Sequence, residues 1–378
     1  MSTLVTAQVT DCTKSIQVKS QTELDQISAC KFYKGTINVS NCTATDLVVH
    51  GVETIEGNLA LIGNTELLHL SLPDLHTIHG RFLLDSNKRL TDISMPKLSR
   101  VGTFEVLVHP SIKDVAFPAG LVQINSLSVT DTTATSIKGI YATKIAHLTL
   151  AGNTYLNSIE LGNLTHVTYA LSVLANAPTL NLNLASMDTI QQGDFRDLAG
   201  VSLGHLSHAS GDLSFVSNTF TNLSLPQLQQ VEGGLSITNN SQLSTMSMPS
   251  LTQLGGALLV AKNPKISSLD SFPKLERVNG TVDILGSFDS IKFSDLHDVR
   301  GGMSLQTSSS KFQCDDINKL KASVIKGHVF SCKSNMSILD ETNKTDKPKD
   351  TSDGVGIGSL YKGYWSGLVS CIALSFLL

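Results

Sequence analysis

The strongest constraint on the fold is a sequence repeat of about 23 residues. Residues 55–64 (IEGNLALIGN) recur as residues 78–87 (IHGRFLLDSN), and residues 231–240 and 254–263 have the same form. A period of about 20 to 29 residues with Leu-x-Leu and a later Asn is typical of leucine-rich and related solenoid repeats. One repeat cannot bury its apolar side chains alone, so we expect only a stacked array to fold.

The apolar residue that opens each repeat can be followed along most of the chain. We place it at Ile55, Ile78, Val101, Ile124, Ile145, Val167, Ile190, Leu206, Val231, Leu254, Val278 and Val299, with residues 34–37 (KGTI) as an earlier first rung. Most steps are 21 to 25 residues long, but the step from Ile190 to Leu206 is only 16. The sequence therefore predicts about 13 rungs, with a possible division into two lobes near residues 193–206.

Each part of the repeat has a physical role that favours β-structure. Leu-x-Leu predicts a short strand with two inward side chains, because side chains alternate along a strand. The later Asn can bond backbone groups at the bend, and the preceding Gly permits a tight corner. No repeat contains a helical run of ten residues. We therefore expect an all-β, leucine-rich-repeat-like parallel β-solenoid rather than a helix-backed horseshoe.

The six cysteines lie near the ends of the chain, and none lies between Cys42 and Cys314. Two pairs, Cys12 with Cys30 and Cys314 with Cys332, have equal separations of 18 residues. Disulfides at these positions would close the exposed ends of a solenoid, so we predict both. Cys42 is left over, either as a buried free thiol or as an alternative partner.

Eight Asn-x-Ser/Thr sequons, together with terminal cysteines, indicate a secretory route and predict N-glycosylation. The sequon asparagines are Asn38, Asn41, Asn163, Asn222, Asn239, Asn279, Asn335 and Asn343.

The C-terminus has the three parts of a signal for attachment of a glycosylphosphatidylinositol (GPI) lipid. Small residues at 352–354 (SDG) precede a nine-residue spacer and an uncharged tail at 364–378. That tail is shorter than the roughly 20 residues of a transmembrane helix. We predict attachment at Ser352, with Gly354 as second choice, and removal of residues 353–378. The alternatives are a tail-anchored helix and an apolar terminus packed on the solenoid.

The remaining segments complete the predicted domain organisation. Residues 1–11 have neither a basic start nor an apolar core, so we expect a signal peptide to be missing or incomplete there. Residues 12–332 form the solenoid. Residues 333–352, rich in Asp, Lys, Asn and Thr, are expected to be a short disordered linker.

The sequence offers little support for catalysis. Eleven histidines are scattered, the closest pairs being His76 with His79 and His205 with His208. Two carboxylate pairs are candidates for glycoside hydrolysis, Asp283 with Asp289 and Asp295 with Asp298. We assign no catalytic residues, no metal ligands, no cofactor and no small-molecule substrate.

Three further features separate the function classes. The only tryptophan lies in the tail, so platforms for sugar rings are scarce. Asp298 falls in register with Gln230 and Gln253, which predicts a solvated position. The net charge of −4 with no basic stripe argues against nucleic-acid binding. A polysaccharide-acting parallel β-helix enzyme and a ligand-binding surface receptor remain as alternatives to a structural protein.

Motifs at both ends resemble a known family. The opening from Cys12 to Cys30, the Ile-x-Gly-x-Leu rungs, and the closure from Phe312-x-Cys314 to Phe330-x-Cys332 precede the lipid-attachment tail. This arrangement resembles the fungal GPI-anchored cell-wall proteins with receptor-L-domain-like repeats, above all the sporulation-specific and wall-organisation members.

The resemblance implies a non-catalytic glycoprotein on the outer face of the plasma membrane and in the cell wall. It also implies that cell-wall polysaccharide or wall proteins are its partners, with the membrane held through the lipid. The chain departs from the family in its short stalk of about twenty residues between Lys333 and the predicted anchor. The short stalk, with Lys344, Lys347 and Lys349 near the anchor, favours the plasma membrane over deep residence in the wall.

Overall fold

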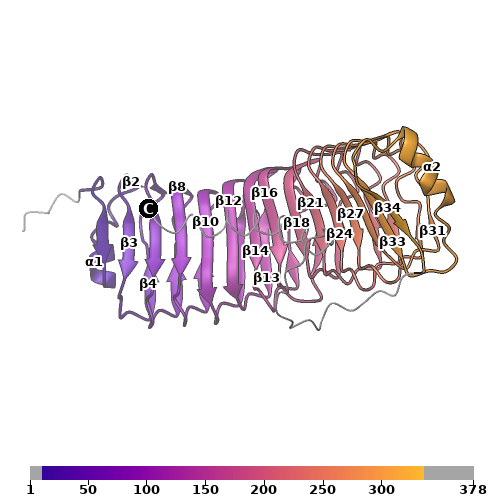
Figure 1. The fold of residues 1–378 in the computed structure, drawn as a ribbon. Helices are drawn as coiled ribbons and strands as arrows, with labels where there is room; N and C mark the ends of the chain where they lie inside the picture. The colour runs from indigo at the N-terminus through magenta and orange to yellow at the C-terminus, as the bar shows by residue number, and fades with distance from the viewer. Residues whose placement is uncertain (1–10, 336–378) are drawn as a thin grey trace, which may run out of the picture. The chain divides into compact units, whose positions relative to one another are not determined.

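A computed structural model describes residues 11–335, which form a parallel β-solenoid of about 13 turns (Figure 1). The predicted fold class is therefore confirmed. Ser352, Gly354, Asn343, Cys371 and most of the predicted linker lie outside the described residues. No helix within residues 11–335 is long and apolar enough to cross a membrane.

A broad sheet of 22 strands runs the length of the solenoid. Its central coils each contribute one long strand: β8 (Thr77–Asp85), β10 (Arg100–His109), β12 (Gln123–Thr132), β14 (Lys144–Ala151), β16 (His166–Leu174) and β18 (Thr189–Arg196). Other coils contribute a two-residue strand: β2 (Phe32–Tyr33), β5 (Thr54–Ile55), β20 (His208–Ala209), β23 (Gln230–Val231), β26 (Gln253–Leu254), β29 (Arg277–Val278) and β32 (Asp298–Val299). The rest are β1 (Ile16–Val18), β3 (Ile37–Ser40), β6 (Leu59–Ile62), β21 (Leu213–Val216), β24 (Leu235–Thr238), β27 (Leu258–Ala261), β30 (Val282–Gly286), β33 (Met303–Thr307) and β34 (Phe330–Lys333).

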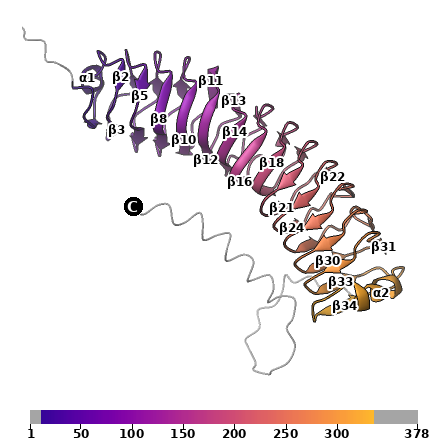
Figure 2. The same cartoon turned by 90° about the horizontal axis from the view of Figure 1, so that it is seen from above.

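Strands of two to eight residues form the opposite side of the solenoid, in small sheets that we call the back sheets. They are β4 (Asp46–Val48), β7 (His69–Ser71), β9 (Asp92–Ser94), β11 (Asp114–Leu121), β13 (Ser136–Ile140), β15 (Ser158–Ile159), β17 (Asn181–Asn183), β19 (Gly200–Ser202), β22 (Asn222–Ser224), β25 (Thr245–Ser247), β28 (Ser268–Leu269) and β31 (Ser290–Ile291). Figure 2 shows the stack of residues 11–335 curving, with the broad sheet on the inner side of the curve.

Equivalent side chains of neighbouring coils lie in register, which builds a continuous core. Phe104 in β10 pairs with Phe82 in β8 and with Leu127 in β12, and all three are fully buried. The rings of Phe82 and Phe104 lie 5.1 Å apart, and those of Phe195 and Phe215 stack at the same distance. Burial of such columns is the main force that holds the coils together.

One position in the repeat was wrongly assigned from the sequence. Ile190 pairs with Ala209, and Ala209 pairs with Val231, so Ala209 rather than Leu206 opens that coil. Leu206 belongs to the preceding turn, where its N–H donates to the carbonyl of Leu203. The sheet is continuous across residues 193–206, because β18 pairs with both β16 and β21.

Both ends of the solenoid carry the predicted disulfides. Cys12 is bonded to Cys30 and Cys314 to Cys332, with Cα–Cα distances of 5.7 and 5.9 Å. Two short helices lie at these ends, α1 (Gln21–Asp25) and α2 (Asp315–Ser323), and each buries an apolar side chain against the core. Cys42 is a buried free cysteine, which settles the alternative left open by the sequence.

The glycines that stand two residues before the inward side chains Leu59 and Phe82 have a different role from the one expected. A Cβ added to Gly57 would lie 2.3 Å from the carbonyl oxygen of Gly35, and one added to Gly80 would lie 2.5 Å from that of Gly57. Gly57 and Gly80 do not have the positive φ for which glycine is usually required. They are needed because successive backbones approach too closely for any side chain.

The predicted interior asparagines form a ladder. Asn64 donates through Nδ2 to the carbonyl of Val39, and its own N–H donates to Oδ1 of Asn87 at 3.0 Å. Asn153, Asn176, Asn218, Asn240 and Asn263 occupy equivalent buried positions. The residue before each of these positions has a positive φ, so the chain turns inward through a left-handed residue at this corner.

Candidate binding surface

Asp283 and Asp289, the first carboxylate pair considered from the sequence, lie on different sides of the solenoid. Asp283 points outward from β30 in the broad sheet, where burial raises its pKa and Thr281 donates to it at 2.6 Å. Asp289 lies before β31 on the back-sheet side, where Ser309 and Lys311 bind it. The two groups therefore have separate partners, one in the broad sheet and the other in the bend before β31.

Asp298 was expected to be solvated, and this prediction is wrong. The predicted register is present, since Gln253 pairs with Arg277 and Arg277 with Asp298. However, the residue is only 7% exposed, because Lys326 at 2.7 Å, Arg277 at 3.2 Å and Arg300 at 3.6 Å surround its carboxylate. Lys326, the largest influence, lowers the pKa of Asp298. These ion pairs link the carboxylate to the preceding coil through Arg277 and to the terminal segment through Lys326.

His205 and His208, the closest histidine pair in the second half of the chain, contact different residues. Nδ1 of His205 lies 2.5 Å from the carbonyl of Ala185, whereas Nε2 of His208 lies 3.1 Å from Oε1 of Glu232. Within residues 11–335 no group of three His, Cys, Asp or Glu side chains is arranged to hold a metal ion.

The described sequons lie on the surface. Asn38 is half-buried in β3, while the other six are exposed: Asn41, Asn163, Asn222, Asn239, Asn279 and Asn335. Asn41 and Asn239 occupy the left-handed corner before the ladder, with φ of 53° and 59°. The side chain of Asn239 donates through Nδ2 to Oγ of Ser217 on the neighbouring coil at 2.9 Å.

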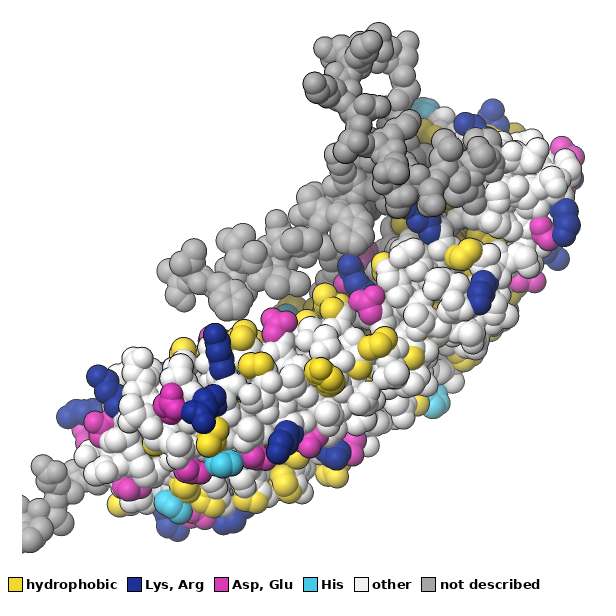
Figure 3. Space-filling model, turned by 90° about the horizontal axis from the view of Figure 1, so that it is seen from below, with side chains coloured by type: hydrophobic (Ala, Val, Ile, Leu, Met, Phe, Trp, Pro, Cys, Tyr) yellow, Lys and Arg dark blue, Asp and Glu magenta, His cyan; other side chains and the backbone are white. Residues whose placement is uncertain are grey.

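Figure 3 shows charged side chains scattered across a mostly uncharged face of the solenoid. The outward residues of the broad sheet are small and polar in many coils, as with Ser128, Ser172, Ser214 and Ser236.

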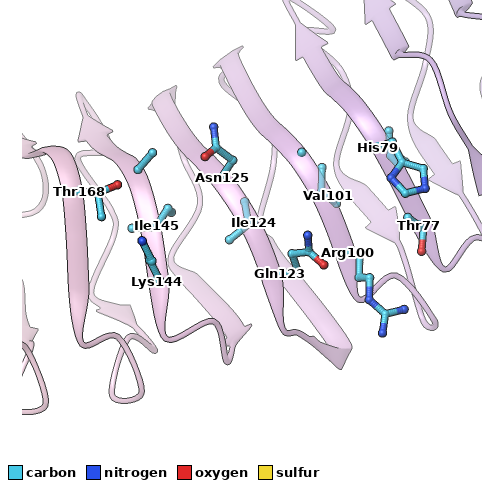
Figure 4. A pocket seen from close by; sticks show the side chains of 13 residues that line it. Thr77, His79, Arg100, Val101, Gln123, Ile124, Asn125, Lys144, Ile145 and Thr168 are labelled. Carbon is cyan, nitrogen blue, oxygen red and sulfur yellow. The ribbon is translucent and has the colours of Figure 1, made fainter.

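A groove of about 280 Å³ does interrupt the broad sheet, and sequence analysis missed it. It crosses five coils from Thr77 to Thr168, as Figure 4 shows. Its origin is a difference in length between coils. Three residues separate the inward positions in β8 (Ile78 and Phe82) and in β16 (Val167 and Leu171), but only two separate them in the coils between.

The shorter coils form the floor of this depression, which we call the central groove. Gly102 and Ala146 keep the floor low, and the longer coils β8 and β16 bound its ends with His79 and Thr168. The signal that could have located the groove is the count of residues between inward positions in three consecutive repeats. These residues can be counted only once the inward positions of every repeat are known.

Figure 4 shows Arg100, Gln123 and Lys144 side by side on neighbouring strands along one flank of the central groove. None of the 13 lining residues is acidic. At the β16 end, the ring of exposed Tyr169 stacks on His147 with centroids 5.0 Å apart and planes 15° apart. These two rings belong to the residues that directly follow Ala146 and Thr168, both of which line the groove.

The fold and its surface define the class: a disulfide-capped parallel β-solenoid in which polar side chains repeat with the coils. The chain belongs to the family of fungal cell-wall proteins that includes the cell wall protein ecm33 of Schizosaccharomyces pombe. The two are 30% identical over 332 residues, which cover 87% of this chain and 78% of the relative. The predicted family resemblance is confirmed.

Other relatives extend the same relationship. A cell surface GPI-anchored protein of Arthroderma benhamiae is 29% identical over 347 residues, covering 92% of this chain and 86% of the relative. Sporulation-specific protein 2 of Saccharomyces cerevisiae is 28% identical over 354 residues, covering 91% and 70%. No family model matches the chain, and no solved structure matches it.

Proposed function

We propose that this chain is a non-catalytic, glycosylated surface protein that supports the organisation and integrity of a fungal cell wall or spore wall. The observation that carries the proposal is the relationship to cell wall protein ecm33 over 87% of the chain. Relatives are named as cell wall, GPI-anchored cell surface and sporulation-specific proteins, and none of these names denotes an enzyme.

The geometry supports a role exercised through an extended surface. The carboxylates considered for chemistry lie in separate environments. Asp283 is in β30 of the broad sheet, Asp289 is in the bend before β31, and Asp298 is enclosed by three cations. A polysaccharide-cleaving β-helix would need clustered acid and base groups across adjacent coils. A scaffold needs only a stiff body with accessible faces, which the interior ladder and the two disulfide caps provide.

The proposed location is the outer face of the plasma membrane and the adjoining wall. Exposed sequons along the solenoid would carry N-linked glycans, and a GPI lipid at Ser352, or at Gly354, would hold the membrane. Wall polysaccharide or wall proteins would be the partners. Removal of the lipid-attachment signal would release the solenoid from the place where these polymers are assembled.

Complementation of a deletion strain tests this proposal. The strain is expected to lose resistance to a glucan-digesting enzyme, and the full chain to restore it. Versions with Asp283→Asn or Asp289→Asn should restore resistance fully. A version lacking one coil, residues 232–254, or the anchor signal after residue 351 should not. Loss of function in a single carboxylate variant with normal folding and surface level would instead support the enzyme alternative.

A further inference from the structure

We infer that the central groove is a binding site for a negatively charged stretch of a saccharide chain. The inference rests on the proposed function, since it names the class of wall polymer that the solenoid would contact. Four features carry it: unpaired cations, amide donors, an exposed aromatic ring and a closed length.

The cations on the flank of the groove are free to bind a ligand. The chain has six arginines, and within residues 11–335 five of them pair with a carboxylate while Arg100 does not. Lys144 likewise has no ion pair among the described residues, and both side chains are exposed. They lie two strands apart, or about 10 Å at the usual spacing between strands.

Charge complementarity selects an anionic occupant. No acidic side chain lines the groove, and the nearby Glu105 is already bound by Arg81. The planar guanidinium of Arg100 can bind two oxygens of a phosphate or carboxylate group at once. Lys144 supplies a second positive charge on the same flank, so a ligand with two anionic groups could be bound at both.

The other features select a saccharide rather than an anion alone. Gln123 and Asn125 place amide groups on β12, the strand between those of the two cations. Amides can both donate to and accept from sugar hydroxyls. Tyr169 is 58% exposed, and its stacking on His147 orients one ring face toward solvent. Flat aromatic faces beside polar donors match a sugar ring, which has C–H bonds on its faces and hydroxyls on its edge.

The closed length of the groove limits the occupant to a short segment of a linear chain. Three short coils at about 4.8 Å each give a floor of roughly 14 Å between the longer coils at either end. A chain must therefore run along the solenoid axis, across the strands, with its charged groups toward Arg100 and Lys144. Backbone pairing with a peptide is not available here, because the strands of the floor are already bonded on both sides.

Binding of defined probes to the purified full chain in detergent tests the inference. The probes are mannotetraose carrying phosphate groups, tetragalacturonate, neutral mannotetraose, inorganic phosphate and a polyglutamate peptide. The phosphate and uronate saccharides distinguish two sources of negative charge, and we expect at least one of them to bind at least tenfold more tightly than neutral mannotetraose. Inorganic phosphate and the peptide should compete weakly.

Matched variants localise the binding. Arg100→Gln with Lys144→Gln should weaken the charged saccharide at least tenfold, and Tyr169→Ala should weaken it several-fold. Lys274→Gln with Lys292→Gln removes two exposed cations elsewhere and should leave affinity unchanged.

Three results would overturn the inference: no measurable binding of either charged saccharide, equal affinity in the Arg100 and Lys144 double variant, or competition by phosphate or peptide as strong as by the saccharide. The wall-resistance assay above is independent of these measurements. Normal complementation by a chain that fails to bind would therefore reject the site and leave the proposed function standing.

Discussion

Asn87 donates through Nδ2 to Nε2 of His109 at 3.3 Å, so a histidine occupies one step of the asparagine ladder. The imidazole is fully buried and pairs in register with Thr132 of the next coil. Burial lowers the pKa of His109 to about 4, although the Leu107 carbonyl and Asp85 favour the charged form. The ring is therefore neutral at pH 7.

This histidine predicts acid sensitivity. In the unfolded chain the ring takes up a proton near pH 6.5, whereas in the folded chain it does so only near pH 4. Burial of the neutral ring therefore contributes fully to the free energy of unfolding above pH 6.5. As the pH falls from 6.5 toward 4, protonation of the unfolded chain removes this contribution, about 3 kcal/mol in total. His109→Asn should remove this dependence, because asparagine is the usual ladder residue.

Urea unfolding at pH 7 and pH 4.5 measures the effect. The native chain should lose more stability over this interval than His109→Asn, while an exposed control, His328→Asn, should behave like the native chain. Equal losses in the native chain and His109→Asn would contradict the prediction.

Val108 predicts a stabilising substitution. It lies at the left-handed corner with φ of 58°, where a β-branched side chain is strained by roughly 1 to 2 kcal/mol. Val108→Gly should therefore raise the free energy of unfolding by about 1 kcal/mol. Ala175→Val, at φ of 52° in the equivalent corner, should lower it by a similar amount. Thermal unfolding of both variants checks the pair, and the same sign for both would refute the strain argument.

The corner glycines predict a large steric effect. Gly57→Ala forces a Cβ to within 2.3 Å of a backbone oxygen, so the coils must separate at a cost of about 1 to 3 kcal/mol or more. Gly162→Ala meets nothing within 4 Å and should change stability by less than about 1 kcal/mol. Midpoints of chemical denaturation compare the two, and equal effects would contradict the close-approach explanation.

The cysteines predict a pattern of chemical accessibility. Peptide mapping without reduction should recover Cys12 linked to Cys30 and Cys314 linked to Cys332. Cys42 should react with an alkylating reagent only after unfolding, because it is buried. Replacing Cys314 and Cys332 together by Ser should destabilise the chain by about 3 kcal/mol. Rapid alkylation of Cys42 in the native protein would show that the first coils open readily.

The C-terminal signal predicts the composition of the mature protein. Mass spectrometry of protein extracted from cells should find a lipid on Ser352 and should not find peptides containing Trp365 or Cys371. Ser352→Trp should shift attachment to Gly354 or abolish it, because the site requires small residues. Recovery of the intact tail from the cell surface would instead support a tail-anchored helix.

Much of the architecture was predictable because it depends on residues that repeat. Leu59 and Leu61 could be placed inward from their spacing, and Asn64 from its position after the strand. The coil opened by Ala209 could not be placed, because a small residue gives no strong apolar signal. The burial of Asp298 also escaped prediction, since Lys326 reaches it from the terminal coil, outside the repeat.

The binding surface was less predictable than the fold, for a different reason. Arg100 and Lys144 look like ordinary solvated cations in the sequence, and the isolated Tyr169 resembles no platform. These residues line or adjoin a groove only because neighbouring coils differ in height. The sequence of one repeat does not show that difference. A similar limit applied to Gly57, whose sequence position identified a corner but did not show the backbone beside it.

The different lengths of the central coils have a consequence for how such a surface can be remodelled. Deleting one residue between two inward positions lowers the outer surface of that coil. The buried side chains on either side of the deletion keep their pairing, as Val101 and Phe104 do with Ile78 and Phe82. The shape of the outer surface can thus change through insertions and deletions that leave the buried core unchanged. An insertion after Ile124 should raise a ridge across the middle of the floor. A deletion in β16 should lengthen the groove by two coils, because Ile190 and Gly193 of β18 are also separated by only two residues. The solenoid can in this way be tailored to longer or shorter polymers without redesigning its interior.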